Sequence, residues 1–144
     1  MNDQNAPHVP PPPPGQRPPA ASQSSTGLDP KLAGLLCYIL GIITGLIFFL
    51  IEKSNDVVRF HAAQSIVFSG SVIVLWIVLM ILGLILTSIS WTLGNLYGLL
   101  TLLVWLGLFV VWVVLLIKGY SGTKWKLPVL GDLAERMASG QRTL

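Results

Sequence analysis

Long apolar segments bounded by charged residues set the pattern of this chain. No Asp, Glu, Lys or Arg occurs in the 58 residues between Arg59 and Lys118, and another 20 uncharged residues separate Lys31 from Glu52. A helix needs about 20 consecutive apolar residues to cross the roughly 30 Å hydrocarbon core of a bilayer. The pattern therefore predicts three transmembrane helices, expected at about residues 32–51, 66–86 and 96–117.

Polar residues beside these segments predict where the helices begin and end. Asp29 is expected to cap the first helix, with Pro30 at the first helical position, where a missing N–H costs nothing. Ser54 or Asn55 is expected to cap the second helix in the same way. The uncharged, hydroxyl-rich residues 87–95 are expected to form the loop between the second and third spans.

The two ends of the chain have different compositions. Eight of the ten prolines lie in the first 19 residues, so residues 1–27 are predicted to be a disordered tail with a polyproline II stretch. A flexible spacer is favoured over a PxxP ligand for this tail. At the other end, a short amphipathic juxtamembrane helix is expected at about residues 128–138, on the membrane surface or against the bundle. The predicted fold class is an all-α integral membrane protein whose polytopic membrane domain covers residues 28–138.

Glycines recur at helical spacing and predict close helix contacts. In lipid, small residues let two helices approach and gain dispersion contacts, and the spacing GxxxG is typical of such faces. A kink or gate at the glycines is the alternative interpretation. The candidate helix-packing residues are Gly34, Gly41, Gly45, Gly94 and Gly98.

Composition and charge narrow the class of protein. Only 10% of the residues are charged and the mean hydropathy is +0.72, which excludes an ordinary soluble enzyme. The net charge of +3 comes from residues that flank the apolar segments, so we expect the lipid bilayer as partner and no nucleic acid. With three spans, Arg17 and Lys31 fall on one side and the other seven Lys and Arg fall on the opposite side. The positive-inside rule then places the C-terminus in the cytoplasm and the Pro-rich tail outside.

A polar cluster begins the second apolar segment and is the candidate site. Its members are Asp56, Arg59, His61, Gln64 and Ser65. His61, Gln64 and Ser65 share one helical face, while Arg59 points nearly opposite, at ion-pair spacing from Asp56. The shared face has three interpretations: interfacial groups that hydrogen-bond neighbouring helices, a vestibule for a translocated substrate, or a proton relay at His61.

No catalytic constellation accompanies this cluster. Two histidines, His8 and His61, and the single Cys37 provide no metal-ligand spacing, and no phosphate-binding or nucleophile motif occurs. We therefore expect no enzyme activity, no cofactor and no metal.

Several of these segments resemble a known family. Residues 36–38, 41–45 and 48–53, the run Arg-Phe-His-Ala-Ala-Gln-Ser at 59–65, and residues 126–134 are similar to small prokaryotic membrane proteins of unknown function, the DUF4870 type. That family is distantly Tic20-like, similar to a subunit of the chloroplast inner-envelope import translocon. The resemblance covers about residues 28–137 and implies a multi-pass protein of a prokaryotic plasma membrane.

Two functions of different classes fit this sequence. The first is a non-enzymatic structural or interaction component of the membrane, which packs with itself or with a membrane-protein partner. The resemblance implies a relation of this component to a protein translocon. The alternative is an oligomeric small transporter or channel subunit, because three spans alone enclose no pore. A third interpretation is a binder of anionic lipid head groups through Arg59 and the basic residues 118–126.

Overall fold

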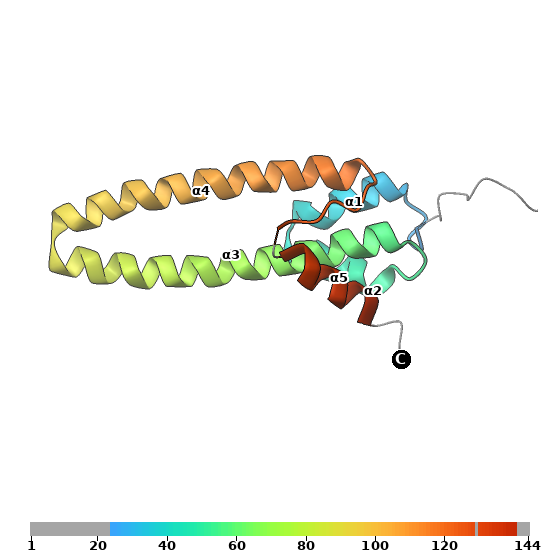
Figure 1. Cartoon of the computed structure of the whole chain (residues 1–144), viewed down its shortest axis with the longest axis horizontal. Helices are drawn as coiled ribbons and strands as arrows, with labels where there is room; N and C mark the ends of the chain where they lie inside the picture. The colour runs from blue at the N-terminus through green and yellow to red at the C-terminus, as the bar shows by residue number, and fades with distance from the viewer. Residues whose placement is uncertain (1–23, 129, 141–144) are drawn as a thin grey trace, which may run out of the picture.

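Helices make up nearly all of the structure. The computed structural model describes residues 24–128 and 130–140, and within them no strand occurs. The elements in chain order are α1 (Pro30–Ile39), α2 (Ile42–Ile51), α3 (Asp56–Ile89), α4 (Trp91–Tyr120) and α5 (Leu130–Gly140) (Figure 1). The prediction of a disordered tail over residues 1–27 falls, apart from its last four residues, outside the described part of the chain.

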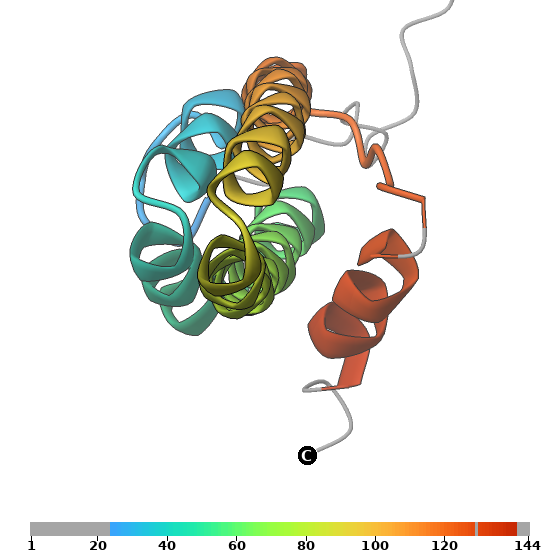
Figure 2. The same cartoon turned by 90° about the vertical axis from the view of Figure 1, so that its left-hand side faces the viewer.

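The molecule has one thick end and one thin end. Helices α3 and α4 form a long antiparallel hairpin, and α1, α2 and α5 gather around the end where α3 begins and α4 finishes (Figure 1). Viewed along the hairpin, α1 and α2 form a layer beside α4 and α3, and α5 lies apart from that layer (Figure 2). The buried core, which includes Tyr38, Phe60 and Leu115, lies in this thick end.

The two long helices confirm the apolar segments as helical. α3 has 34 residues and α4 has 30, which correspond to about 51 Å and 45 Å at 1.5 Å per residue. The predicted loop at residues 87–95 is wrong, because only Ser90 interrupts the helices. The hydroxyl-rich residues remain helical because a hydroxyl can bond to a carbonyl of the preceding turn. Ser88, for example, donates a hydrogen bond to the carbonyl of Ile85.

The first predicted span is not one helix. Residues 32–51 are divided at Leu40 and Gly41 into α1 and α2, each ten residues long, and Gly41 adopts φ +58°. At about 15 Å each, neither helix reaches across a 30 Å hydrocarbon core. Within the described residues, two helices, α3 and α4, are long and apolar enough to cross a membrane, so a third transmembrane helix is not confirmed.

Side chains satisfy the backbone carbonyls that the break between α1 and α2 frees. The carbonyl of Cys37 accepts hydrogen bonds from Ser65 Oγ at 2.6 Å and Thr44 Oγ1 at 3.1 Å. The carbonyl of Tyr38 accepts the indole N–H of Trp112 at 3.0 Å. Broken helices persist in apolar surroundings only where such partners exist, and here α3 and α4 supply two of the three donors.

The chain returns to its starting end after α2. Ser24, which precedes α1, donates a hydrogen bond to Glu52, which follows α2. Both ends of residues 32–51 thus lie at the same end of the molecule, and the structure does not confirm that this segment carries the chain across a membrane. The physical reason is the break at Gly41, which folds α2 back along α1.

Close backbone contacts hold α1 and α2 against the long hairpin. A Cβ atom placed on Gly34 would lie 2.5 Å from the carbonyl oxygen of Gly119 in α4. A Cβ on Gly45 would lie 3.1 Å from both the Ala62 carbonyl and the Ser65 side chain of α3. The predicted C-terminal helix is observed as α5, which starts at Leu130 and packs on α3 with Gly131 and Ala134 buried.

Candidate functional site

The polar residues of the thick end centre on Glu52, in the turn between α2 and α3. Its carboxylate is completely buried and accepts hydrogen bonds from the backbone N–H groups of Ser25, Ser54 and Asn55. The hydroxyls of Ser24, Ser25 and Ser54 also donate to it. We call these five residues the Glu52 cluster. It ties the chain before α1 to the start of α3.

These donors decide the charge of Glu52. Burial by itself raises the pKa of the carboxyl, but the hydrogen bonds from Ser24, Ser25 and Asn55 outweigh it and lower the pKa from 4.5 to about 2. The carboxylate is consequently ionised at neutral pH. Asn55 also caps α3, since its side chain accepts from the backbone N–H groups of Val57 and Val58.

His61 bridges three segments of the chain. Its Nδ1 lies 3.1 Å from the Tyr38 hydroxyl of α1, and its Nε2 lies 3.0 Å from the Thr123 carbonyl after α4. Since a carbonyl only accepts, Nε2 carries the proton and Nδ1 accepts the Tyr38 hydroxyl. These contacts are those of a polar group that hydrogen-bonds its neighbours, and they join α1, α3 and the segment before α5.

Gln64 and Arg59 are also buried in α3. Gln64 is 0% exposed, and neither its amide nitrogen nor its amide oxygen has a hydrogen-bond partner. The Arg59 guanidinium carbon lies 5.4 Å above the centre of the Phe49 ring of α2, a cation–π arrangement. Asp56 and Arg59 line one pocket of about 220 Å³, shared with Lys124 and with Glu135 of α5.

The structure buries four of the five polar candidates, and the buried candidates contact different parts of the chain. Arg59, His61, Gln64 and Ser65 are buried, while Asp56 is exposed at the start of α3. Ser65 faces the break between α1 and α2, with Oγ 3.0 Å from the Gly41 carbonyl. Asp56 and Arg59 thus share the pocket beside α5, whereas His61 and Ser65 contact different parts of the chain.

The five candidate glycines also have separate surroundings. Gly34 and Gly45 lie in helix contacts within this chain, and Gly41 lies outside any helix. Gly94 packs on Thr87 across the turn between α3 and α4, where a Cβ would lie 2.5 Å from Thr87 Oγ1. Nothing lies within 4 Å of a Cβ placed on Gly98.

Sequence reasoning missed Glu52, Tyr38 and the serines at 24 and 25. The available signal was the position of Glu52, the first charged residue after 20 uncharged ones, followed by Ser54 and Asn55. A carboxylate there accepts the N–H groups two and three residues later, which is how short polar side chains stabilise turns. The pairing with Ser24 and Ser25 has no such local signal, because 27 or more residues separate them.

Helices α3 and α4 are long and apolar, and no residue from position 69 to position 114 is buried. These features define the class, a helical membrane protein whose polar residues gather at one end. The chain belongs to the family described as the magnetosome magnetite crystal formation protein family, which matches residues 26–134.

Relatives of the chain carry names of the same class. A UPF0132 membrane protein of Methanocaldococcus jannaschii is 42% identical over 114 residues, which cover 79% of this chain and 93% of that protein. Another from Archaeoglobus fulgidus is 39% identical over 114 residues, which cover 78% of this chain and 99% of that protein. No solved structure matches the chain. The comparisons confirm a small membrane-protein family.

Among the described residues, no group of three or more His, Cys, Asp or Glu side chains is placed to hold a metal ion.

Proposed function

We propose that this protein is a non-enzymatic assembly component of a prokaryotic plasma membrane, which packs with further copies or with a membrane-protein partner through α3 and α4. The observation that carries the proposal is the absence of any buried residue from position 69 to position 114. Over this stretch the two helices contact each other, the end of α1 with the turn that follows it, and α5 near Leu133, and most of their outer surface stays uncovered. Helices that associate in lipid do so through packing of such faces.

The faces available to a partner are apolar and include small residues. Exposed leucines follow one another along α4, and Gly98 and Gly107 have open space where a Cβ would stand. A partner helix can approach closely at such positions. Gly34 and Gly45, in contrast, are already covered by α4 and α3 of the same chain.

The arrangement of charge supports one orientation. Every Lys and Arg of the described residues lies at the thick end: Lys31, Lys53, Arg59, Lys118, Lys124, Lys126 and Arg136. The turn between α3 and α4 has none. By the positive-inside rule, the thick end faces the cytoplasm, with α1 and α2 as a re-entrant pair that enters and leaves on that side.

Cysteine cross-linking tests the assembly. In a Cys37→Ala background, single cysteines at Leu99, Leu100, Leu102 and Leu103 sample the exposed side of α4, and Leu133→Cys in α5 is the control. We expect cross-linked copies or a cross-linked partner at one or two adjacent positions of α4 and none at the control. Absence of any product at all four positions, with thiol labelling intact, would falsify the proposal.

The identity of a captured partner sets the kind of assembly. The resemblance of residues 59–65 to a DUF4870-type, distantly Tic20-like family supports a complex that handles protein translocation. The family's description names magnetosome magnetite crystal formation, and a membrane protein that assembles with further copies is compatible with that role as well. Secretion machinery among the captured proteins supports the first, and self-linked copies alone support a homo-oligomer.

One observation favours a second candidate, a subunit of an oligomeric transporter or channel. Gln64 holds an amide with no partner inside a segment of apolar helices, and buried polar groups in membrane helices often mark pathways. Flux through reconstituted protein, lost in Gln64→Leu and kept in Ser71→Ala, would support it. Cross-linked oligomers without flux would contradict the transporter and keep the assembly role as the remaining candidate.

A further inference from the structure

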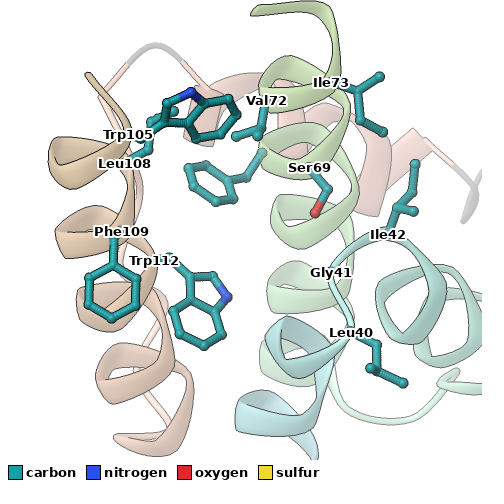
Figure 3. A pocket seen from close by; sticks show the side chains of 11 residues that line it. Leu40, Gly41, Ile42, Ser69, Val72, Ile73, Trp105, Leu108, Phe109 and Trp112 are labelled. Carbon is teal, nitrogen blue, oxygen red and sulfur yellow. The ribbon is translucent and has the colours of Figure 1, made fainter. Parts of the chain in front are cut away.

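A lateral apolar pocket lies where α1 turns into α2. It measures about 530 Å³ and is enclosed by three parts of the chain: the turn at Gly41, one face of α3 that includes Ser69 and Val72, and the Trp105–Trp112 face of α4. Figure 3 shows Trp105 and Trp112 projecting from α4 toward α3, with Gly41 on the far side. Pockets that hold small ligands have volumes of about 300–1,000 Å³.

The depth of the pocket follows from the length of α1. Ten helical residues rise about 15 Å from the charged end, half of a hydrocarbon core of about 30 Å. The pocket therefore lies near the middle of the bilayer. Its rim residues Leu40, Ile73 and Phe109 are exposed and continuous with the apolar outer surface of α3 and α4. The opening consequently faces lipid.

The walls restrict the chemistry of an occupant. Ser69 provides the one side-chain hydroxyl among the lining residues, and two indole N–H groups are the other side-chain polar groups. The indole N–H of Trp112 is already donated to the Tyr38 carbonyl. No lining residue is charged. The Ser69 hydroxyl and the Trp105 indole N–H are few polar groups for a charged or strongly polar occupant, whereas a hydrocarbon chain contacts apolar wall over most of its length.

We propose that this pocket is a lipid site that holds the hydrocarbon tail of a membrane lipid. The pocket opens onto the lipid-facing surface, so a tail of the surrounding bilayer enters without crossing a polar layer. A void of this size would leave the wall atoms without dispersion partners. The site does not require the assembly proposed above, and it remains in a single copy of the chain.

Tryptophan fluorescence reports directly on this occupant. A single-tryptophan protein that keeps Trp112, with the other four changed to Phe, is reconstituted in vesicles of phospholipid brominated at the middle of the acyl chains. Bromine quenches a tryptophan that it contacts. We expect the emission of Trp112 to fall at least twofold relative to vesicles of the unbrominated lipid.

Filling the pocket separates a bound tail from general contact with lipid. Val72→Phe places a ring in the pocket from α3, and Leu108→Phe does so from α4. Both are expected to restore at least half of the lost emission. The matched control Val110→Phe makes the same kind of change on the outer face of α4 and should leave the quenching unchanged. A protein that keeps only the exposed Trp91 monitors the lipid composition of each preparation.

Two outcomes overturn the proposal. In the first, Trp112 is not quenched by brominated lipid, or both filled variants show as much quenching as the unfilled protein. Each variant must keep its helical circular dichroism for this comparison to count. In the second, a neighbouring copy fills the pocket, so that brominated lipid does not reach Trp112 and Val72→Cys protein, in a Cys37→Ala background, cross-links to itself. The second outcome would contradict the lipid site while supporting the assembly role.

Discussion

Glu52 combines complete burial with a negative charge, and its donors make the combination stable. An ionised carboxylate without partners would be strongly destabilising in such a place. Three backbone N–H groups and three hydroxyls surround it instead. The cluster joins segments that lie before α1 and after α2, so its integrity determines how the thick end closes.

Replacing the carboxylate should loosen that end at neutral pH. Glu52→Gln puts an amide N–H₂ group against donors that need an acceptor, and hydrogen bonds to charged groups contribute about 1.5–3 kcal/mol each. We expect a lower midpoint of thermal unfolding in detergent and faster proteolysis near Ser25. Glu135→Gln is the control, since Glu135 is exposed and contacts Lys126 at the surface. Equal effects of both variants would contradict the role of the cluster.

Acid should weaken the same contacts in a defined range of pH. Because the folded-state pKa of Glu52 is about 2 and its ordinary value is 4.5, the stabilisation is present above pH 4.5 and is lost as the pH falls toward 2. The unfolding midpoint, followed by circular dichroism, should decline over that interval. The decline should be smaller in Glu52→Gln, which has no group to protonate at this position. An identical decline in both proteins would count against the ionised carboxylate.

Ser65 performs a comparable task at the break between α1 and α2. Removing its hydroxyl leaves Thr44 as the remaining side-chain donor to the Cys37 carbonyl. Ser65→Ala should destabilise the protein by about 1 kcal/mol. Ser71→Ala on the same helix is the matched control, because the Ser71 hydroxyl bonds only to Val67 within α3. Similar unfolding midpoints for the two variants would show that the break does not depend on Ser65.

At the scale of elements, the sequence predicts apolar helices well and their interruptions poorly. The charge-free runs and the caps at Asp29 and Asn55 are local signals, and the structure contains the helices that they predict. The break at Gly41 depends on donors from Ser65 and Trp112, which are 24 or more residues away along the chain. The glycine spacing in residues 32–51 allowed a kink as its alternative interpretation, but it did not indicate that the helix ends at Leu40 and that the chain reverses there. The same holds for the site, where His61 was visible as a polar residue but its partner Thr123 was not.

The conformation of Gly41 gives the break its sharpest test. With φ +58° and ψ −118°, Gly41 adopts a conformation that side chains with a Cβ atom rarely take and that costs them about 1–3 kcal/mol, and a Cβ would also lie 2.7 Å from Ser69 Oγ. Gly41→Ala should therefore lower the unfolding midpoint, whereas Gly98→Ala, in open space on α4, should leave it unchanged or raise it slightly. If residues 32–51 formed one continuous helix in the membrane, Gly41→Ala would be stabilising instead.

At the scale of the whole molecule, the fold separates a polar end from an apolar one. All charged residues of the described chain lie at the thick end, where α1, α2 and α5 surround the hairpin. The thin end carries hydroxyls and aromatic side chains at its turn, and Trp91 is exposed there. This asymmetry is what an inserted hairpin requires, because charges are costly in the hydrocarbon core and aromatic side chains suit its boundary.

This asymmetry makes the sidedness of the chain measurable. A pair of re-entrant helices leaves Leu28 and Ser121 on the same side of the membrane, whereas a third full span would put them on opposite sides. In a Cys37→Ala background, we compare single cysteines at Leu28, Ser121 and Ser88 for labelling by a membrane-impermeant maleimide in intact cells. We expect labelling at Ser88 alone, at the turn between α3 and α4, and labelling of all three after permeabilisation. Labelling of Leu28 together with Ser88 in intact cells would support the three-span topology and contradict the re-entrant pair. Ser24 and Glu52 would then lie on opposite sides of the bilayer and could not form their hydrogen bond.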